Sequence, residues 1–311
     1  MTAPAPAARQ TAPVGREGTA ILVKGSTRTR RNVLFDTAFS MVLFVATLVG
    51  VVALAMLLWS IYDRGWDRLA ADPVAFLQNF ASRRPTRAGI RAALWGSIWL
   101  MGLVALFAVP IGVGAALYLE EFAPRRRLTT IVETNISNLA GVPSVVYGIL
   151  GLGVFVQFLD LGETIIAGAL TLAVMSLPVI IIAGREAIRA VPQSVRLGAY
   201  GLGATKWQVA RTLVLPAAMP GTLTGTILAL SRALGETAPL LVVGAKVSIF
   251  NTPSSVDSEF SALPMIIFDW TQRPQREWAY AAAAAIIVLL AVLLAMNAVA
   301  IFLRNRYSTR W

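Results

Sequence analysis

Residues 277–303 read EWAYAAAAAIIVLLAVLLAMNAVAIFL, and this stretch decides the class of fold. Glu277 is the one charged residue in it. An α-helix needs about 20 consecutive apolar residues to cross the roughly 30 Å hydrocarbon core of a bilayer, and this run meets that length. The sequence therefore predicts an integral membrane protein in which residues 277–303 form a spanning helix.

Five further apolar runs are long enough to span, which predicts an all-α protein with six transmembrane helices. The other runs are 34–62, 91–119, 130–159, 163–183 and 216–244. The run 130–159 is the least regular, because it contains Asn135, Asn138 and Pro143. Such residues are tolerated at membrane depth where neighbouring protein satisfies the backbone, so we expect this helix inside the bundle. A count of five spans would instead place the two termini on opposite sides.

The composition agrees with a membrane protein and disfavours other classes. Of the residues, 57% are hydrophobic and 14% are charged, whereas soluble domains have about 45–50% and 25%. Cysteine and histidine are absent, which removes disulfides, thiolate chemistry, imidazole bases and the usual zinc ligands, so we expect neither a membrane enzyme nor a metal site. The net charge of +11 does not indicate nucleic-acid binding, because the basic residues lie in short clusters between apolar runs.

The distribution of basic residues predicts that both termini are cytoplasmic, since most of the 27 then fall in inside segments. Residues 1–33, rich in Ala, Pro, Thr and Arg, are expected to be a disordered cytoplasmic tail. The remaining predicted segments are an external loop at 63–90, a core with five spans at 91–303, and a cytoplasmic tail at 304–311. Within the core, a cytoplasmic loop is expected at 185–219. The external loop 245–276 contains an apolar patch, which is expected to pack on the outer face of the bundle.

The loop 185–219 has the pattern of a helix–turn–helix. Pro192 suits a helix start, Gly203 suits a tight turn, and Leu215-Pro216 is expected to restart a helix, because Pro is favoured in a first turn. Such a loop could be a connector whose amphipathic face rests on lipid. It could also be a docking element for a soluble partner.

Two opposite charges fall inside the run 216–244. Arg232 and Glu236 are spaced i, i+4 and share one helix face. A charge at this depth costs about 2.5–3.5 kcal/mol on insertion scales, so each needs a partner. The pair could fix helix packing. Alternatively, Arg232 could contact a transported anion, since a guanidinium suits tetrahedral oxyanions, with Glu236, Ser231 and Thr237 beside it on the predicted substrate pathway.

Glycines in two of the runs predict close packing and not a nucleotide site. Gly221 and Gly225 form a G-x-x-x-G pattern that lets another helix approach closely. Lys206 follows Thr205 and not Gly, so the chain has no G-x-x-x-x-G-K-S/T phosphate-binding loop at this point.

The loop resembles the conserved cytoplasmic loop of ABC importer permeases. That loop has the pattern EAA, three residues, Gly, nine residues, I-x-L-P, and here Gly203 precedes LVLP at 213–216 by the same spacing. The EAA positions are Leu197, Gly198 and Ala199, so the acidic residue is missing. In the family this loop is a coupling helix that enters a cleft of the ATPase. The resemblance therefore assigns ATPase coupling to Leu197, Gly198, Ala199, Gly203, Lys206, Trp207, Leu215 and Pro216.

A second resemblance is to phosphate importer permeases of the PstA type. The stretch SRALGETAPL at 231–240 is similar to their signature RAIGETAPL, and LAGVPSVVYG at 139–148 and YLEEFAP at 118–124 follow the same pattern. The resemblance implies the type I ABC importer bundle. The implied partners are a second permease, two ATP-binding subunits and an external phosphate-binding protein.

The resemblance further implies a bacterial plasma membrane protein that binds no cofactor, with ATP and Mg on the partner subunits. Other oxyanions such as molybdate or phosphonate, and the paralogous phosphate permease subunit, remain alternatives. A secondary transporter or channel is a further alternative of a different class.

Overall fold

The computed structural model describes residues 27–124 and 126–307, and the chain divides into two compact units, residues 1–57 and 58–311. In the first unit the described residues are helical and begin α1 (Thr27–Ala71), whose apolar span starts at Phe35. Residues 1–26 of the predicted tail lie outside the described part. The prediction of disorder is wrong for residues 27–33, because no Gly or Pro in this segment stops the helix of the apolar run from extending into it.

All regular elements of the described residues in the second unit are helical. After α1 come α2 (Pro73–Gln78), α3 (Arg91–Leu117), η1 (Tyr118–Phe122), α4 (Arg127–Ala140), α5 (Ser144–Gly151), η2 (Leu152–Phe158), α6 (Ile165–Arg189), α7 (Gln193–Gly201), α8 (Lys206–Val209), η3 (Ala210–Val214), α9 (Leu215–Gly235), α10 (Ala238–Val243), α11 (Leu263–Gln272) and α12 (Arg276–Tyr307). The elements labelled η are π-helical turns.

The described residues contain five helices long and apolar enough to cross a membrane. They are 35–71, 91–122, 165–189, 206–235 and 276–306, and a bent helix pair, α4 with α5 and η2, makes a sixth if it crosses as one span. The predicted all-α membrane fold is confirmed. Several boundaries differ, because α1 and α2 occupy much of the predicted loop 63–90, α6 extends to Arg189, and α12 continues to Tyr307.

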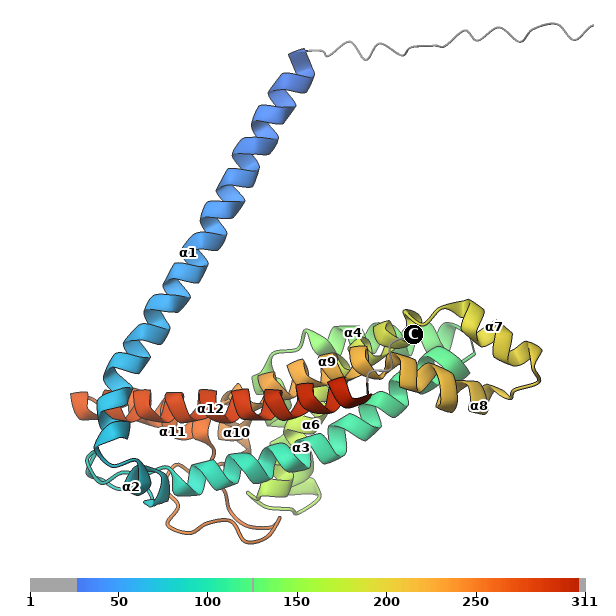
Figure 1. Ribbon diagram of the computed structural model, residues 1–311. Helices are drawn as coiled ribbons and strands as arrows, with labels where there is room; N and C mark the ends of the chain where they lie inside the picture. Colours follow the sequence, from blue (N-terminus) through green and yellow to red (C-terminus); the bar gives the residue numbers. More distant parts are fainter. Residues whose placement is uncertain (1–26, 125, 308–311) are drawn as a thin grey trace, which may run out of the picture. The chain divides into compact units, whose positions relative to one another are not determined.

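Helix α6 lies at the centre of the second unit. It packs most extensively against α3 and α9 (Figure 1), and Leu100, Leu172 and Ile180 are fully or almost fully buried between these helices. A Cβ added at Gly221 of α9 would lie 2.8 Å from the Cβ of Ala187, and one added at Gly225 would overlap Ala183. The G-x-x-x-G pattern is therefore a close contact between α9 and α6, as predicted.

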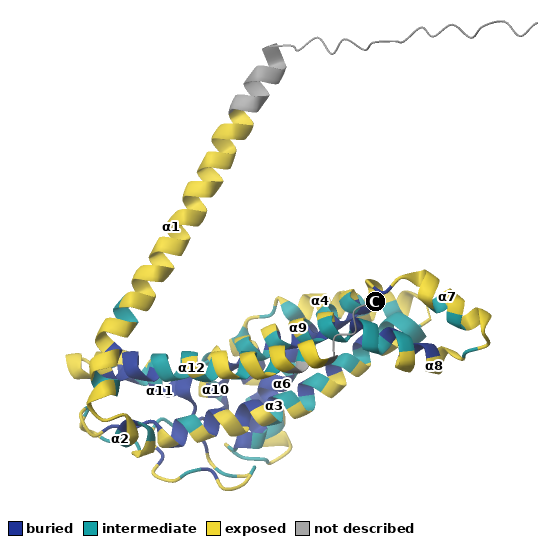
Figure 2. Cartoon of the chain, viewed as in Figure 1, coloured by how far each residue is buried: buried dark blue, intermediate teal, exposed yellow. Residues whose placement is uncertain are grey.

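The predicted spanning segment 130–159 is not one continuous helix, because α4 and the following pair α5–η2 are bent by 104°. Helix α4 ends at Gly141, and Pro143 starts α5 with φ −56° and ψ 138°. Proline lacks an N–H and disfavours helical geometry in the residue before it, so the helix cannot continue through Val142-Pro143. Contrary to the expectation of an interior helix, α4 has no buried side chain among its described residues, whereas α5 buries Tyr147, Gly148 and Gly151 (Figure 2).

The predicted helix 216–244 is also interrupted. Helix α9 ends at Gly235, Glu236 is extended with φ −76° and ψ 125°, and α10 begins at Ala238. Pro239 in the first turn of α10 favours a new start at this place. Gly148 of α5 packs against this start, since a Cβ there would lie 2.8 Å from Cα of Pro239. The two broken helices thus meet at their breaks.

The sequence predicted that a new helix starts at Leu215-Pro216, and this prediction is wrong. Elements α8, η3 and α9 run as one helix from Lys206 to Gly235, with η3 directly before Pro216. A π-helical turn bonds residues five apart, so it accommodates a proline that cannot donate a hydrogen bond. In the loop 245–276, the apolar patch begins α11, whose Leu263, Met265 and Ile266 are buried, so the patch packs on the bundle, and its place on the external side stays a prediction.

Candidate functional site

A small cavity lies at the junction of the two broken helices. Its lining comes from the end of α4, the start of α5, α6 and α9: Leu139, Ala140, Val142, Tyr147, Met175, Ser176, Val179, Ala229 and Arg232. Arg232 supplies the one charged side chain of this lining. Apart from this guanidinium and two hydroxyls, the cavity is apolar, and its volume of about 10 Å³ holds no more than one water molecule, so an anion could meet Arg232 only from its exposed side.

Arg232 is 54% exposed in its side chain, and Glu236 is 18% exposed. The Nε atom of Arg232 lies 3.3 Å from Oε1 of Glu236. The pair is therefore only partly buried within this chain, and both the packing pair and the anion contact stay predictions. Besides its pair with Glu236, the guanidinium leaves about half of the side-chain surface of Arg232 uncovered by this chain.

The other three predicted pathway residues, Glu236, Ser231 and Thr237, do not line this cavity. Ser231 donates a hydrogen bond from Oγ to Oδ1 of Asn297 on α12, at 2.8 Å. Thr237 precedes α10, where its carbonyl accepts a hydrogen bond from the N–H of Leu241. The structure thus brings Arg232 to the cavity and places Ser231 at a helix–helix contact.

Six of the eight predicted coupling residues lie on a hairpin, α7–α8 (residues 193–209), at one end of the second unit (Figure 1). Gly203 turns the chain with φ +82°, and Thr205 caps α8 through a reciprocal pair of hydrogen bonds with Gln208. Leu197, Gly198 and Lys206 are exposed on the hairpin, as is Trp207, whereas Ala199 is partly buried. Leu215 and Pro216 lie outside the hairpin, partly buried in the continuous helix that follows it.

The hairpin also exposes apolar side chains that the sequence did not single out. Leu202 beside the turn is 91% exposed, and Val195 and Tyr200 are exposed as well. Exposed apolar groups gathered on one short element mark a surface for an interaction.

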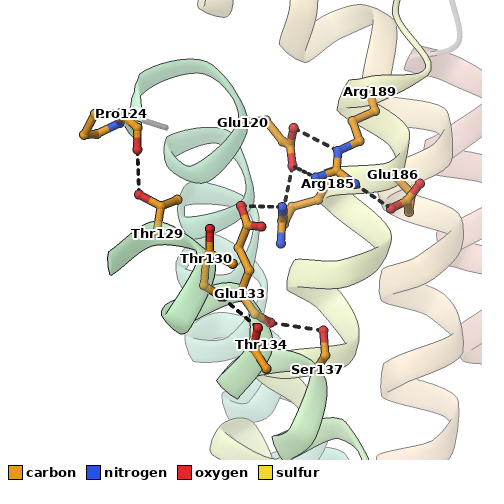
Figure 3. A network of polar contacts seen from close by, with 10 residues as sticks. All are labelled: Glu120, Pro124, Thr129, Thr130, Glu133, Thr134, Ser137, Arg185, Glu186 and Arg189. Atoms are coloured by element: carbon orange, nitrogen blue, oxygen red, sulfur yellow. Dashed lines mark hydrogen bonds and ion pairs between the residues drawn. The ribbon is translucent and has the colours of Figure 1, made fainter. Parts of the chain in front are cut away.

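A network of ion pairs links η1, α4 and α6, and sequence reasoning missed it (Figure 3). Arg185 of α6 binds Glu120 of η1 and Glu133 of α4, both at 2.7 Å. Arg189 also binds Glu120, at 2.9 Å, and its Nη1 lies 3.3 Å from Oε1 of Glu186. Arg185 and Arg189 are one helical turn apart, so their side chains share one face of α6 and reach the same carboxylate.

Next to this network, Glu121 of η1 pairs with Arg196 of α7 at 2.9 Å. The sequence contains a signal for the ion pairs of both Glu120 and Glu121. Consecutive glutamates end one apolar run, and arginines end another, and in the six-span prediction both ends lie on the same side of the membrane.

A wider cavity of about 780 Å³ opens beside the network, lined by polar groups that include Arg126, Arg127, Thr130 and Glu133. Within the described residues, no group of three or more acidic side chains is arranged to hold a metal ion.

Broken membrane helices that meet around a cavity with a charged side chain define a membrane protein of the transporter class. Residues 108–306 match the family described as "Binding-protein-dependent transport system inner membrane component". This match spans more than half of the chain, which therefore belongs to this family of ABC importer permease subunits.

Individual relatives agree with this family. The chain is 31% identical over 264 residues to "Phosphate transport system permease protein PstA 1" of Mycobacterium tuberculosis, which covers 84% of this chain and 86% of that protein. It is 37% identical over 166 residues to "Probable ABC transporter permease protein YqgI" of Bacillus subtilis, covering 53% of this chain and 56% of that protein. The resemblance to PstA-type permeases is thereby confirmed.

A solved structure agrees on the fold. The crystal structure of a bacterial alginate ABC transporter in complex with an alginate pentasaccharide-bound periplasmic protein contains a chain that superposes with a TM-score of 0.62. The superposition covers 90% of this chain and 96% of that chain, at 16% identity. The type I ABC importer fold implied by the sequence is confirmed.

Proposed function

We propose that this chain is the permease subunit of an ATP-driven phosphate importer in the bacterial plasma membrane. The observation that carries the proposal is Arg232, a half-exposed guanidinium at a cavity where two interrupted helices meet. A planar fork of N–H donors binds a tetrahedral oxyanion at two points. The named PstA relative supports phosphate as that anion.

The translocation pathway would lie between this chain and a second permease subunit. Helix α4 supports this, because it carries Thr134, Ser137 and Asn138 and yet packs no side chain fully into its own unit. Polar residues on a membrane helix are stable when they face a water-filled pathway or another subunit. The partner would complete the lining of the cavity at Arg232.

Energy would come from two ATP-binding subunits docked on the α7–α8 hairpin. Its exposed Leu197, Leu202 and Trp207 give an apolar docking surface, which does not depend on the acidic residue absent at position 197. ATP and Mg would be held by those subunits. A periplasmic-type phosphate-binding protein would deliver the anion to the face that carries the loop 245–276.

The proposal is tested by phosphate uptake into vesicles that contain the assembled transporter. Uptake should require both ATP and the external binding protein, and Arg232→Gln should remove it. Uptake that proceeds without ATP would identify a secondary transporter or channel. Preferential uptake of molybdate or a phosphonate in the same assay would keep the ABC importer and replace the anion.

A further inference from the structure

Two consecutive side chains of η1 connect it to different moving parts of the proposed transporter. Glu121 binds Arg196 of α7, in the hairpin. Glu120 binds Arg185 and Arg189 of α6, and Arg185 also binds Glu133 of α4. A continuous series of ion pairs therefore runs from the hairpin to α4 through one π-helical turn.

The connection between η1 and the hairpin is rigid because the guanidinium of Arg196 bonds to three different residues. Besides its pair with Glu121, it donates from Nη1 to the carbonyl of Val191 at 2.6 Å and from Nη2 to the carbonyl of Ile188 at 2.8 Å. The side chains of Glu121 and Arg196 are only 9% and 16% exposed. A shielded pair is weakly screened by salt and is costly to break, so η1 and α7 should move together.

The connection to α4 differs from the one at the hairpin, because polar contacts hold this helix. None of the described side chains of α4 is buried. Its Glu133 forms an ion pair with Arg185, which lies on α6 near the hairpin. At the other end α4 meets the bend at Gly141 and Pro143. Besides this ion pair, single hydrogen bonds from Thr129 to Pro124 and from Tyr147 to Leu139 connect α4 to its neighbours. A helix with so few polar links and a bend at one end can pivot when the partner of its ion pair moves.

We propose that Glu120, Glu121, Glu133, Arg185 and Arg196 are positioning residues that transmit the movement of the docked hairpin to α4. This inference rests on the proposed function, and it names the side chains that join ATP binding to the pathway. When the ATPase subunits close, the hairpin pulls η1 through Glu121. Glu120 and Arg185 then shift Glu133, and α4 turns about its bend.

The movement is measurable because the chain contains no cysteine. Spin labels on Ile131→Cys of α4 and Leu106→Cys of α3 occupy exposed positions and report the distance between these helices. The assembled transporter, with cysteines of the other subunits replaced, is measured with and without the ATP analogue AMP-PNP. The labelled parent should change its distance distribution when the analogue binds, whether or not phosphate is present.

Glu133→Gln and Glu121→Gln should each remove most of this change while the ATPase subunits stay bound. ATP consumed per phosphate carried should rise by roughly tenfold, within the usual range of a coupling between two sites. Because the links act in series, Glu121→Gln with Glu133→Gln should be no worse than either single variant. Independent structural defects would instead add.

Glu186→Gln is the matched control, since Glu186 pairs only within α6 and does not join two elements among the described contacts. It should respond as the parent does. A normal response in assembled Glu133→Gln, or additive losses in the double variant, would overturn the proposed transmission from the hairpin to α4, here called the relay. If Glu121→Gln does not assemble, the Glu133→Gln arm decides, because that side chain is 32% exposed and tolerates substitution.

The outcomes also separate the relay from the function on which it rests. A labelled parent that ignores the analogue contradicts ATP coupling and the relay together. A transporter that responds to the analogue but carries another anion contradicts the phosphate assignment and leaves the relay intact.

Discussion

Tyr147 of α5 donates a hydrogen bond from Oη to the carbonyl oxygen of Leu139 in the last turn of α4, at 2.8 Å. This bond spans the bend of 104° and reaches a carbonyl in the last turn of α4 that also accepts from the N–H of Val142 at 3.1 Å. Tyr147 is also buried, and it lines the cavity of Arg232. The bond thus joins the two arms of the bend beside the charged group.

Tyr147→Phe should loosen this bend without emptying the space that the ring fills. The lost hydrogen bond should lower the stability of the assembled protein by about 1 kcal/mol, measured by thermal unfolding in detergent. Phosphate uptake should fall as well. Tyr280→Phe, at an exposed tyrosine of α12, is the control and should change neither quantity.

Four proteins distinguish an anion contact at Arg232 from a packing pair. Because Arg232 is half exposed, we expect Arg232→Gln to assemble normally and lose uptake, and Arg232→Lys to keep part of it, since lysine retains charge without the bidentate fork. Glu236→Gln should be milder. If both Gln variants lose assembled protein and their combination restores it, the pair serves packing instead.

Gly203→Val should impair docking of the ATPase subunits and leave insertion into the membrane unchanged. No atom lies within 4 Å of an added Cβ at this position, so only the backbone with φ +82° resists the substitution. A β-branched residue there is strained. Co-purification of the ATPase measures the effect, and Gly201→Ala in α7, which is also free of contacts, should behave as the parent. Normal co-purification with Gly203→Val would count against the docking assignment.

Gly225→Ala should destabilise the contact of α9 with α6. The added Cβ would overlap Ala183, and overpacking of a closely packed site costs about 1–3 kcal/mol. Gly114→Ala in α3 adds the same methyl group where no atom lies within 4 Å. Thermal unfolding of both variants should show a loss for Gly225→Ala alone.

Reporter fusions test the arrangement of the chain in the membrane. A reporter after Trp311 should be cytoplasmic, and one inserted at Ser254 should be external, if the bent pair crosses as one span. An external reporter after Trp311 would mean that α4, α5 and η2 enter and leave on the same side.

The long spans were predictable because runs such as 91–119 and 277–303 have enough apolar residues to leave no other stable structure in lipid. The interruptions were harder to predict. Pro143 and Pro239 both signal a break, yet proline also occurs within continuous helices here, as Pro110 and Pro178 show. Which prolines break a helix depends on whether neighbouring groups satisfy the freed backbone atoms, and this is a property of packing.

The part of the candidate site that was predictable is the part whose residues lie close together in the sequence. The positions of Arg232 and Gly203 followed from local spacing. The network at Arg185 joins residues far apart in the sequence, so it required knowing that η1, α4 and α6 converge. Ser231 was assigned to the pathway from its neighbour in the sequence, but adjacent helical residues face different directions, and its hydroxyl contacts α12.

The π-helical turn η3 provides a place where the chain can be one residue shorter. A turn whose hydrogen bonds join residues five apart holds one residue more than an α-helical turn. Deleting one residue from 210–214 can therefore convert η3 to ordinary α-helix and keep the faces of α8 and α9 in phase. The same deletion within α9 would rotate everything beyond it by about 100°. Between Gly203 and Pro216 this chain could accordingly lose one residue without turning the hairpin relative to the membrane helix.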